Sequence, residues 1–184
     1  MRKTALLAVL TLGLALAGNA QANSYIQAGY VDYDDFGDGG GAALSSSIFG
    51  PLSFHVAHDS VEFLDRTRAG VAFTFNMIPL LDFEAGLNYE RWDFDFDGNG
   101  NGLVSGDGDE SGQSVYAELQ YTFVPMFRFS GRVEYIDVFE DEDEMVAGIG
   151  ARIGPNTGPS AHITFDRFTD SEFNVVRTSF RWGF

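Results

Sequence analysis

Apolar and polar residues alternate with a period of two along most of the chain after residue 23. The pattern is clearest in residues 68–76, 81–90, 114–123 and 173–184. A period of two places successive side chains on opposite faces of an extended strand, whereas a helical face repeats about every 3.6 residues. Because no stretch of this region shows a convincing helical period, the sequence predicts an all-β protein.

The alternation and the turn residues between segments predict ten strands. A strand that crosses a membrane needs roughly 9–11 residues, so ten strands would use roughly 100 residues. The segment 40–49 consists of small residues and alternates weakly, which leaves eight strands as an alternative. The expected strands are residues 24–32, 40–49, 52–59, 67–76, 81–92, 113–124, 127–138, 145–154, 160–168 and 173–184.

Two kinds of connection alternate along the chain. Short turns hold all five prolines, whereas the other connections are acidic and include a long one at residues 97–112. Short turns alternating with longer polar loops are typical of an antiparallel up-and-down transmembrane β-barrel. The turns are Gly50-Pro51, Met77–Leu80, Pro125-Met126 and Pro155–Pro159, and the acidic connections are Asp32–Asp38, Asp59–Asp65, Asp93–Glu110, Asp137–Glu144 and Asp170–Glu172.

Alternation alone does not say which face of the strands points inward, and a soluble calyx with an apolar interior shows the same period. The polar face here is rich in small residues, which suit a crowded lumen. The only lysine is Lys3, although a solvated exterior would normally carry several. We therefore expect the apolar face to contact lipid. The small residues of the polar face are Gly29, Ala57, Gly70, Ala72, Gly86, Ser130, Gly148 and Gly150.

Aromatic residues cluster near the predicted strand ends, as in the two interfacial girdles of a membrane barrel. Aromatic residues are also good strand formers, which is the simpler explanation for part of this pattern. The loop-side group is Tyr89, Trp92 and Phe94, and the turn-side group is Phe123, Phe127, Trp182 and Phe184.

The N-terminal region has the order of a secretory signal peptide. Arg2 and Lys3 precede the apolar run Ala5–Ala17, and Ala20-Gln21-Ala22 supplies small residues at a cleavage site. The apolar run is shorter than the roughly 20 residues of a spanning helix. We expect residues 1–22 to be removed and residues 23–184 to form one barrel domain in the outer membrane of a Gram-negative bacterium.

Composition excludes several function classes. The chain has no cysteine, which excludes a disulfide framework and a lipid-carrying cysteine. Its formal charge is −16, and loss of Arg2 and Lys3 with the signal peptide would leave −18. Such an acidic protein repels nucleic acid and attracts divalent cations.

The chain after the signal peptide resembles the small outer-membrane barrels of Gram-negative bacteria, in particular the Xanthomonas-type outer-membrane barrel proteins. The resemblance rests on Tyr25–Tyr30, the Asp/Gly-rich first loop and Tyr89-Glu90-Arg91. It implies a porin-like barrel and carries no catalytic residue. The aromatic C-terminal residues, Trp182 and Phe184, resemble the signal that the barrel-assembly machinery reads.

The polar face carries six acids and six arginines. An unpaired buried charge costs several kcal/mol, and arginine binds carboxylates through two parallel hydrogen bonds. The sequence therefore predicts an ionic network that plugs the lumen, although a narrow channel stays open as an alternative. The residues are Arg68, Asp82, Glu84, Glu90, Glu118, Arg128, Arg132, Glu134, Arg152, Asp166, Arg177 and Arg181.

The longest acidic loop contains a weak calcium-binding pattern. Asp93, Asp95 and Asp97 alternate before a glycine, but the twelfth position is Val104 instead of glutamate. The simpler interpretation is a strand leaving the membrane with aspartates in water. Ca²⁺ or Mg²⁺ could still bridge Asp93, Asp95, Asp97, Asp107 and Asp109, with the acids at Glu140–Glu144 as further candidates.

No catalytic motif is present in the sequence. His58 and Asp59 are adjacent in a predicted strand and point to opposite faces, so they cannot form a dyad with each other. His55 and His162 lie on the lumen face, where structural hydrogen bonding is the commoner role. The sequence thus predicts a non-enzymatic barrel without a resident cofactor, serving envelope structure or surface interaction. A narrow passive channel is the alternative, and a barrel enzyme is the third.

The expected partners follow from this location. They are outer-membrane lipid, lipopolysaccharide and the barrel-assembly machinery, with no nucleic acid. We expect the protein to be a monomer.

Overall fold

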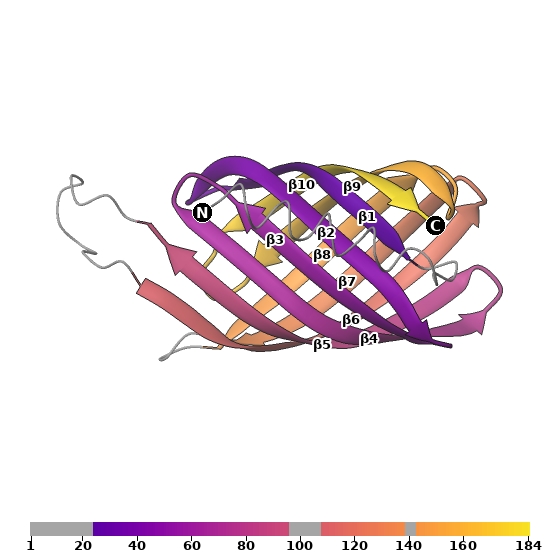
Figure 1. Cartoon of the computed structure of the whole chain (residues 1–184), viewed down its shortest axis with the longest axis horizontal. Helices are drawn as coiled ribbons and strands as arrows, with labels where there is room; N and C mark the ends of the chain where they lie inside the picture. Colours follow the sequence, from indigo (N-terminus) through magenta and orange to yellow (C-terminus); the bar gives the residue numbers. More distant parts are fainter. Residues whose placement is uncertain (1–23, 96–107, 139–142) are drawn as a thin grey trace.

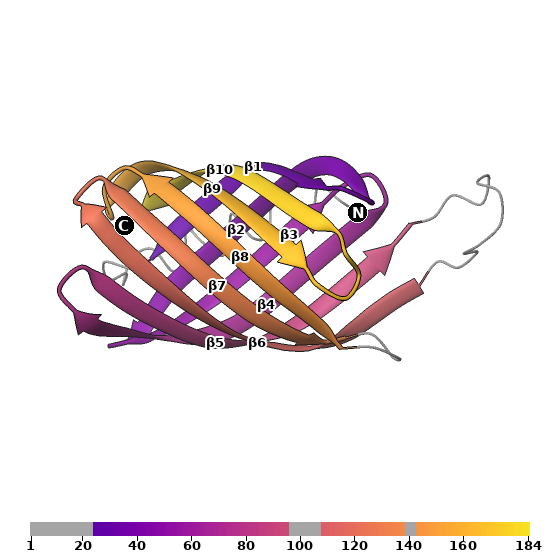
Figure 2. The same cartoon turned by 180° about the vertical axis from the view of Figure 1, so that it is seen from behind.

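The computed structural model describes residues 24–95, 108–138 and 143–184, which form a closed ten-stranded barrel (Figure 1). Each strand pairs antiparallel with its neighbours in the sequence, and β1 pairs with β10 to close the ring (Figure 2). The strands are β1 (Tyr25–Tyr33), β2 (Gly37–Phe49), β3 (Leu52–Ser60), β4 (Leu64–Ile78), β5 (Leu81–Phe94), β6 (Gly108–Val124), β7 (Phe127–Asp137), β8 (Glu144–Ile153), β9 (Gly158–Phe168) and β10 (Asn174–Gly183).

The prediction of an all-β up-and-down barrel is therefore confirmed, with ten strands and not eight. Several strands are longer than expected, because the hairpins continue to pair beyond the alternating segments. Strands β5 and β6 pair as far as Phe94 and Gly108. The predicted signal peptide lies outside the described residues, and the described chain contains no helix long and apolar enough to cross a membrane.

The register determines which side chains enter the lumen. Directly paired residues share a face of the sheet, so the odd-numbered residues of β1, β2, β3 and β10 face the same side as the even-numbered residues of β4 to β9. These are the residues that carry most of the charge and most of the buried polar atoms. The opposite face carries exposed apolar side chains along β4 to β10.

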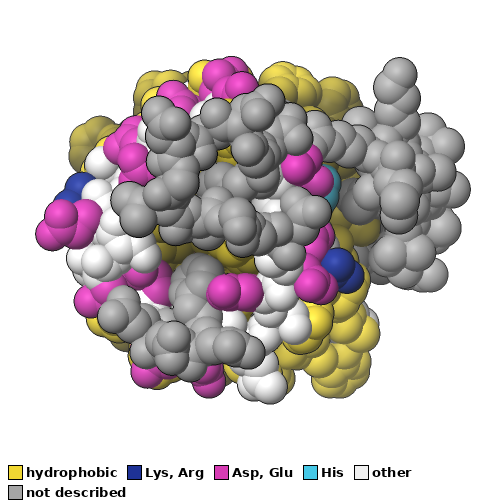
Figure 3. Space-filling view, turned by 90° about the vertical axis from the view of Figure 1, so that its left-hand side faces the viewer, with side chains coloured by type: hydrophobic (Ala, Val, Ile, Leu, Met, Phe, Trp, Pro, Cys, Tyr) yellow, Lys and Arg dark blue, Asp and Glu magenta, His cyan; other side chains and the backbone are white. Residues whose placement is uncertain are grey.

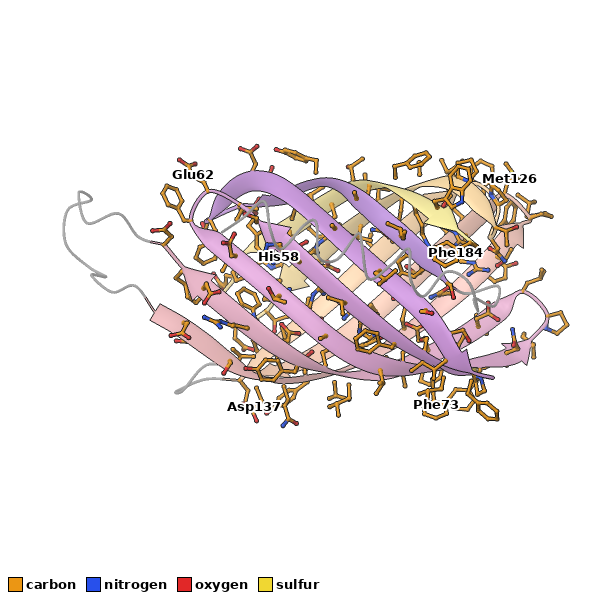
Figure 4. The ribbon with its side chains drawn as sticks, in the orientation of Figure 1. His58, Glu62, Phe73, Met126, Asp137 and Phe184 are labelled. Carbon is orange, nitrogen blue, oxygen red and sulfur yellow. The ribbon has the colours of Figure 1, made fainter. Side chains whose placement is uncertain are left out.

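Phe73 is one of these outward residues, and Figure 4 shows it outside the ribbon. An apolar belt on this scale exceeds what soluble monomers expose. The soluble calyx is therefore excluded, because its apolar face would lie inside. The belt includes Val71, Phe73, Phe75, Leu87, Val115, Leu119, Phe129, Val133, Ile149, Ile163, Phe165 and Phe180.

The two ends of the barrel differ as the sequence predicts. Proline-containing turns lie at one end, where Phe184 N donates to Ser24 O (2.9 Å) and Figure 4 labels Met126 and Phe184. The acidic connections lie at the other end, where Figure 4 labels Glu62 and Asp137. We call these the turn end and the loop end.

Candidate functional site: the barrel lumen

An apolar cluster fills the lumen at the loop end. Its members come from β1, β4, β5, β7, β8, β9, β10 and the adjoining loops, and each is no more than 6% exposed. We call this cluster the apolar plug. It consists of Val31, Tyr33, Val61, Leu64, Trp92, Ile136, Val138, Val146, Phe168, Phe173 and Val175, with Phe36 and Phe94 packed against it.

Aromatic contacts in the plug cross the lumen. Trp92 of β5 meets Phe168 of β9 edge to face, with ring centroids 5.9 Å apart. Three strands separate β5 from β9 on one side of the ring and five on the other, so this contact spans the interior. Phe168 stacks on Phe173 at 4.1 Å, and Phe36 joins Phe173 (5.4 Å) to Phe94 (5.8 Å). The described side chains thus close the loop end with packed rings.

The prediction that Trp92 and Phe94 belong to an interfacial girdle is wrong. Trp92 is 1% exposed and lies inside the barrel, whereas Tyr89 is outward and 55% exposed. The alternation along the strand predicts the inward position, because Trp92 and Phe94 are in phase with the polar residues Glu84 and Glu90. Their apolar rings had instead suggested contact with the membrane interface.

A dense ionic network lies directly beneath the plug. Arg66 Nη2 lies 2.7 Å from Glu90 Oε2, and these side chains are 2% and 0% exposed. Trp92 Nε1 donates to the same oxygen (3.1 Å), and the Arg66 guanidinium lies 4.4 Å from the Trp92 ring centroid. The plug and the charges are therefore one packed unit, in which Arg66 is neutralised by Glu90 and covered by Trp92.

A second carboxylate, that of Glu134, joins the network through Ser114. The Ser114 hydroxyl lies 2.6 Å from Glu90 Oε1 and 2.8 Å from Glu134 Oε1. Arg132 pairs with Glu134 at 2.9 Å, and Asn88 donates to Ser114 (3.0 Å). Each buried carboxylate here has a hydrogen-bond donor, which buried charges require.

Asp59, which is paired across strands with Arg66, organises a neighbouring set of charges. Its Oδ2 accepts hydrogen bonds from the Tyr33 hydroxyl (3.0 Å) and from Arg177 Nη2 (2.9 Å), and it lies 3.7 Å from Arg68. Arg177 also donates to Asp166 at 2.6 Å. Asp59 is 4% exposed, so its assignment to an acidic loop is wrong. Its odd number places it on the lumen face of β3.

The structure places all twelve charged residues of the predicted network on the lumen face. Sequence reasoning missed Arg66 and Asp59, which add one charge of each sign. Arg66 lies one residue before the predicted strand 67–76, and Asp59 is the last residue of the predicted strand 52–59, where it was assigned to the acidic connection. Glu84 and Glu118 form no ion pair within 4.0 Å with any arginine that the structure describes; Glu84 instead accepts hydrogen bonds from Tyr116 (2.8 Å) and Thr74 (3.1 Å).

The turn-side half of the lumen is less tightly filled. A polar cavity of about 200 Å³ extends from mid-barrel to Asn156 in the turn after β8. Among the described residues six arginines line it against three acids. They are Arg68, Arg128, Arg132, Arg152, Arg177, Arg181, Glu84, Glu118 and Asp166.

Acidic side chains surround the loop end in Figure 3. Of the proposed cation ligands, Asp97 and Asp107 lie outside the described residues. Asp93 and Asp109 both contact the exposed Arg91, at 3.0 and 3.3 Å. The described residues contain no group of three or more side chains arranged to hold a metal ion.

One acid of the loop segments is structural. Glu144 is 2% exposed, and its carboxylate accepts the backbone N–H groups of Asp170 (2.9 Å) and Ser171 (3.0 Å). These bonds fix the loop that carries Phe173 of the plug. Glu144 is therefore occupied by the backbone and is not a free ligand for a cation.

The three histidines lie apart. His55 bonds to Asn88 (2.5 Å) in the lumen, and His58 bonds to Thr67 (2.9 Å) on the other face of β3. His162 lines the turn-side cavity, paired across strands with Arg152. No described histidine lies beside a nucleophile and an orienting carboxylate, the geometry that hydrolytic catalysis needs.

Comparison with known proteins shows a porin-like fold. The chain is similar to a KdgM porin, with a TM-score of 0.53 and 11% identity over 87% of this chain and 99% of that chain. The structure of a KdgM porin in complex with disordered oligogalacturonate gives 0.49 and 13% over 87% and 99%. Omp33, an outer-membrane protein of Acinetobacter baumannii, gives 0.44 and 10% over 89% and 100%.

At these identities the likeness concerns the fold alone. The sequence matches no protein-family model and no curated protein. The resemblance to the Xanthomonas-type barrels therefore stays a prediction.

Proposed function

We propose that this protein is a non-enzymatic, porin-like outer-membrane barrel that forms a narrow passive channel for small solutes. The observation that carries the proposal is the polar cavity of about 200 Å³ inside a closed barrel with an apolar exterior. Solutes enter from the turn end, and the apolar plug closes the loop end in this conformation. Passage requires the plug to move.

The membrane location is supported by the outward face. The exposed apolar side chains along β4 to β10 favour transfer into lipid. At the turn end Phe123, Phe127 and Trp182 are exposed, and at the loop end Tyr30, Tyr89 and Tyr135 are exposed. Such rows suit the two membrane–water interfaces. The acidic loop end would then face outward beside anionic lipopolysaccharide, with Mg²⁺ or Ca²⁺ offsetting the repulsion, and the turns would face the periplasm.

The C-terminal strand supports the assembly route. Trp182 is outward and exposed, and Phe184 follows at the turn end. Both residues would be accessible to the barrel-assembly machinery before β10 pairs with β1. A monomer suffices, because β1 and β10 pair with each other and leave no free sheet edge.

Single-channel recording in planar bilayers tests the channel. Phe168 and Phe165 lie on opposite faces of β9, so Phe168→Ala opens the plug and Phe165→Ala is the matched control on the lipid face. We expect rare, small conductance events in the wild-type barrel. Phe168→Ala combined with Trp92→Ala should raise conductance several-fold, and Phe165→Ala should not.

A structural or surface-interaction role is the second proposal, and the plug itself favours it. Packed rings and buried ion pairs across the lumen are what a permanently closed scaffold requires. If neither the wild-type barrel nor the double plug variant conducts, while both remain folded, the channel proposal is wrong and the scaffold role takes its place.

A further inference from the structure

The arginines nearest the turn end have fewer acidic partners than the arginines in the rest of the lumen, although Arg128 also donates to the neutral side chains of Gln120 (2.9 Å) and Thr122 (3.2 Å). Arg128 lies 3.8 Å from Asp82. Among the described ion pairs of the lumen arginines, only the contact between Arg66 and Glu134 is longer, at 4.0 Å. Arg152 and Arg181 form no ion pair within 4.0 Å among the described side chains. Glu118 lines the same cavity from β6 but also makes no such pair.

These side chains form a continuous arc on adjacent strands. Arg128 of β7 is directly opposite Arg152 of β8, and Arg152 is directly opposite His162 of β9. Arg181 follows on β10, with its guanidinium 3.3 Å from the centroid of the Tyr25 ring. All five residues line the cavity. Three guanidinium groups therefore share one wall.

This arrangement is unfavourable in an empty barrel. Like charges directly opposite each other destabilise a sheet, and a buried charge without a counter-charge costs several kcal/mol. Arg152 is 6% exposed, and its buried Nε has no hydrogen-bond partner. Its Nη2 reaches only the neutral amide of Asn156. Arg152 also lines the polar cavity, together with Arg128 and Arg181.

We propose that Arg128, Arg152 and Arg181 form a binding site for a small oxyanion on the turn side of the lumen. Guanidinium groups bind phosphate and carboxylate oxygens through paired N–H donors, with planar geometry that lysine cannot supply. An oxyanion in the cavity would supply Arg152 and Arg181 with a counter-charge and offset the repulsion between the three cations. Asn156 and His162 complete the wall around it.

The inference builds on the proposed function by naming a solute class for the channel. Solute reaches the site from the turn end, so the site works whether or not the plug opens. It can therefore be tested by equilibrium binding to the folded barrel in detergent, which requires no conduction.

Calorimetric titration with inorganic phosphate, against NaCl of equal ionic strength, measures the site. We expect saturable binding of phosphate to the wild-type barrel. Arg152→Gln should weaken it about tenfold to a hundredfold, the usual effect of losing a charged hydrogen-bond donor. Arg91→Gln is the control, because Arg91 is an exposed arginine outside the lumen.

Thermal unfolding separates a binding site from a structural arginine. In phosphate-free buffer Arg152→Gln should raise the melting temperature, since it removes one of three crowded charges, and phosphate should no longer raise it further. The proposal is overturned if phosphate and matched NaCl act alike on the wild-type barrel, or if Arg152→Gln binds phosphate as the wild type does. Binding without conductance in the plug variants would overturn the channel and leave this site standing.

Discussion

The two halves of the lumen use the same residue types and reach opposite results. On the loop side Arg66, Arg132 and Arg177 lie within 2.6–2.9 Å of carboxylates and below packed rings. On the turn side Arg128 has one distant carboxylate, and Arg152 and Arg181 have none within 4.0 Å. Equal numbers of acids and arginines therefore do not imply that all of them pair, because the position of each charge along the barrel axis decides whether it meets a partner.

Side-chain volume accounts for part of this difference. Large residues such as Trp92, Phe168 and Tyr33 fill the loop side and exclude water. Small residues such as Ala43, Ser53 and Ser130 line the turn side and leave the cavity. An anion in the cavity can therefore offset the charge of Arg152 and Arg181, whereas Arg66, 2% exposed and outside the cavity lining, depends on protein partners.

The largest expected effect compares the same substitution in the two halves. Arg66→Gln leaves Glu90 buried without its counter-charge and should lower the free energy of unfolding by about 3–5 kcal/mol. Arg152→Gln should not lower the free energy of unfolding, because it leaves no buried carboxylate without its counter-charge. Urea unfolding in lipid vesicles measures both. Equal destabilisation by the two substitutions would remove the distinction between the halves.

A smaller effect is expected from one hydroxyl group. Tyr33 and Tyr25 both point into the lumen from β1, but only Tyr33 bonds to Asp59 and Arg177. Tyr33→Phe should cost about 1–3 kcal/mol of unfolding free energy, since it leaves buried charged partners short of one hydrogen bond. Tyr25→Phe is the matched control, and we expect it to change stability little. A cost at Tyr25 as large as that at Tyr33 would contradict the comparison.

The loop that closes the plug offers a local test. Glu144→Gln keeps only one of the two acceptor oxygens, so it should release the N–H group of either Asp170 or Ser171 and lower the local opening free energy by roughly 1–2 kcal/mol. Hydrogen exchange at the released amide should accelerate accordingly. Glu172→Gln, in the same loop but exposed, is the control. Unchanged exchange in Glu144→Gln would mean that the plug is held by its rings alone.

The smallest effect is expected outside the lumen, at the proposed cation sites. Arg91 already neutralises part of the charge of Asp93 and Asp109, so Ca²⁺ should stabilise the wild-type barrel by less than about 1 kcal/mol beyond matched NaCl. Arg91→Gln frees both carboxylates and should enlarge the calcium response in thermal unfolding. Identical responses to Ca²⁺ and NaCl in both proteins would show that these acids are a solvated surface.

The sequence by itself determined the up-and-down barrel and the face that points outward, and it favoured ten strands over eight. Period-two alternation requires only that neighbouring side chains point to opposite faces, which is a local property of a strand. Charged residues such as Glu90 and Arg132 had no stable place on the lipid side. The lumen positions of the predicted charges therefore followed from parity alone.

Only the tertiary structure decided which lumen residues meet. The contact between Trp92 and Phe168 depends on ring closure across non-adjacent strands, and local alternation carries no information about it. The same holds for Asp59, whose partners Tyr33 and Arg177 come from β1 and β10. Arg66 and Arg152 look alike in the sequence, but cross-strand register places one beside a carboxylate and the other beside an arginine. Packing in three dimensions therefore divides one uniform polar face into a sealed half and an open, positively charged half.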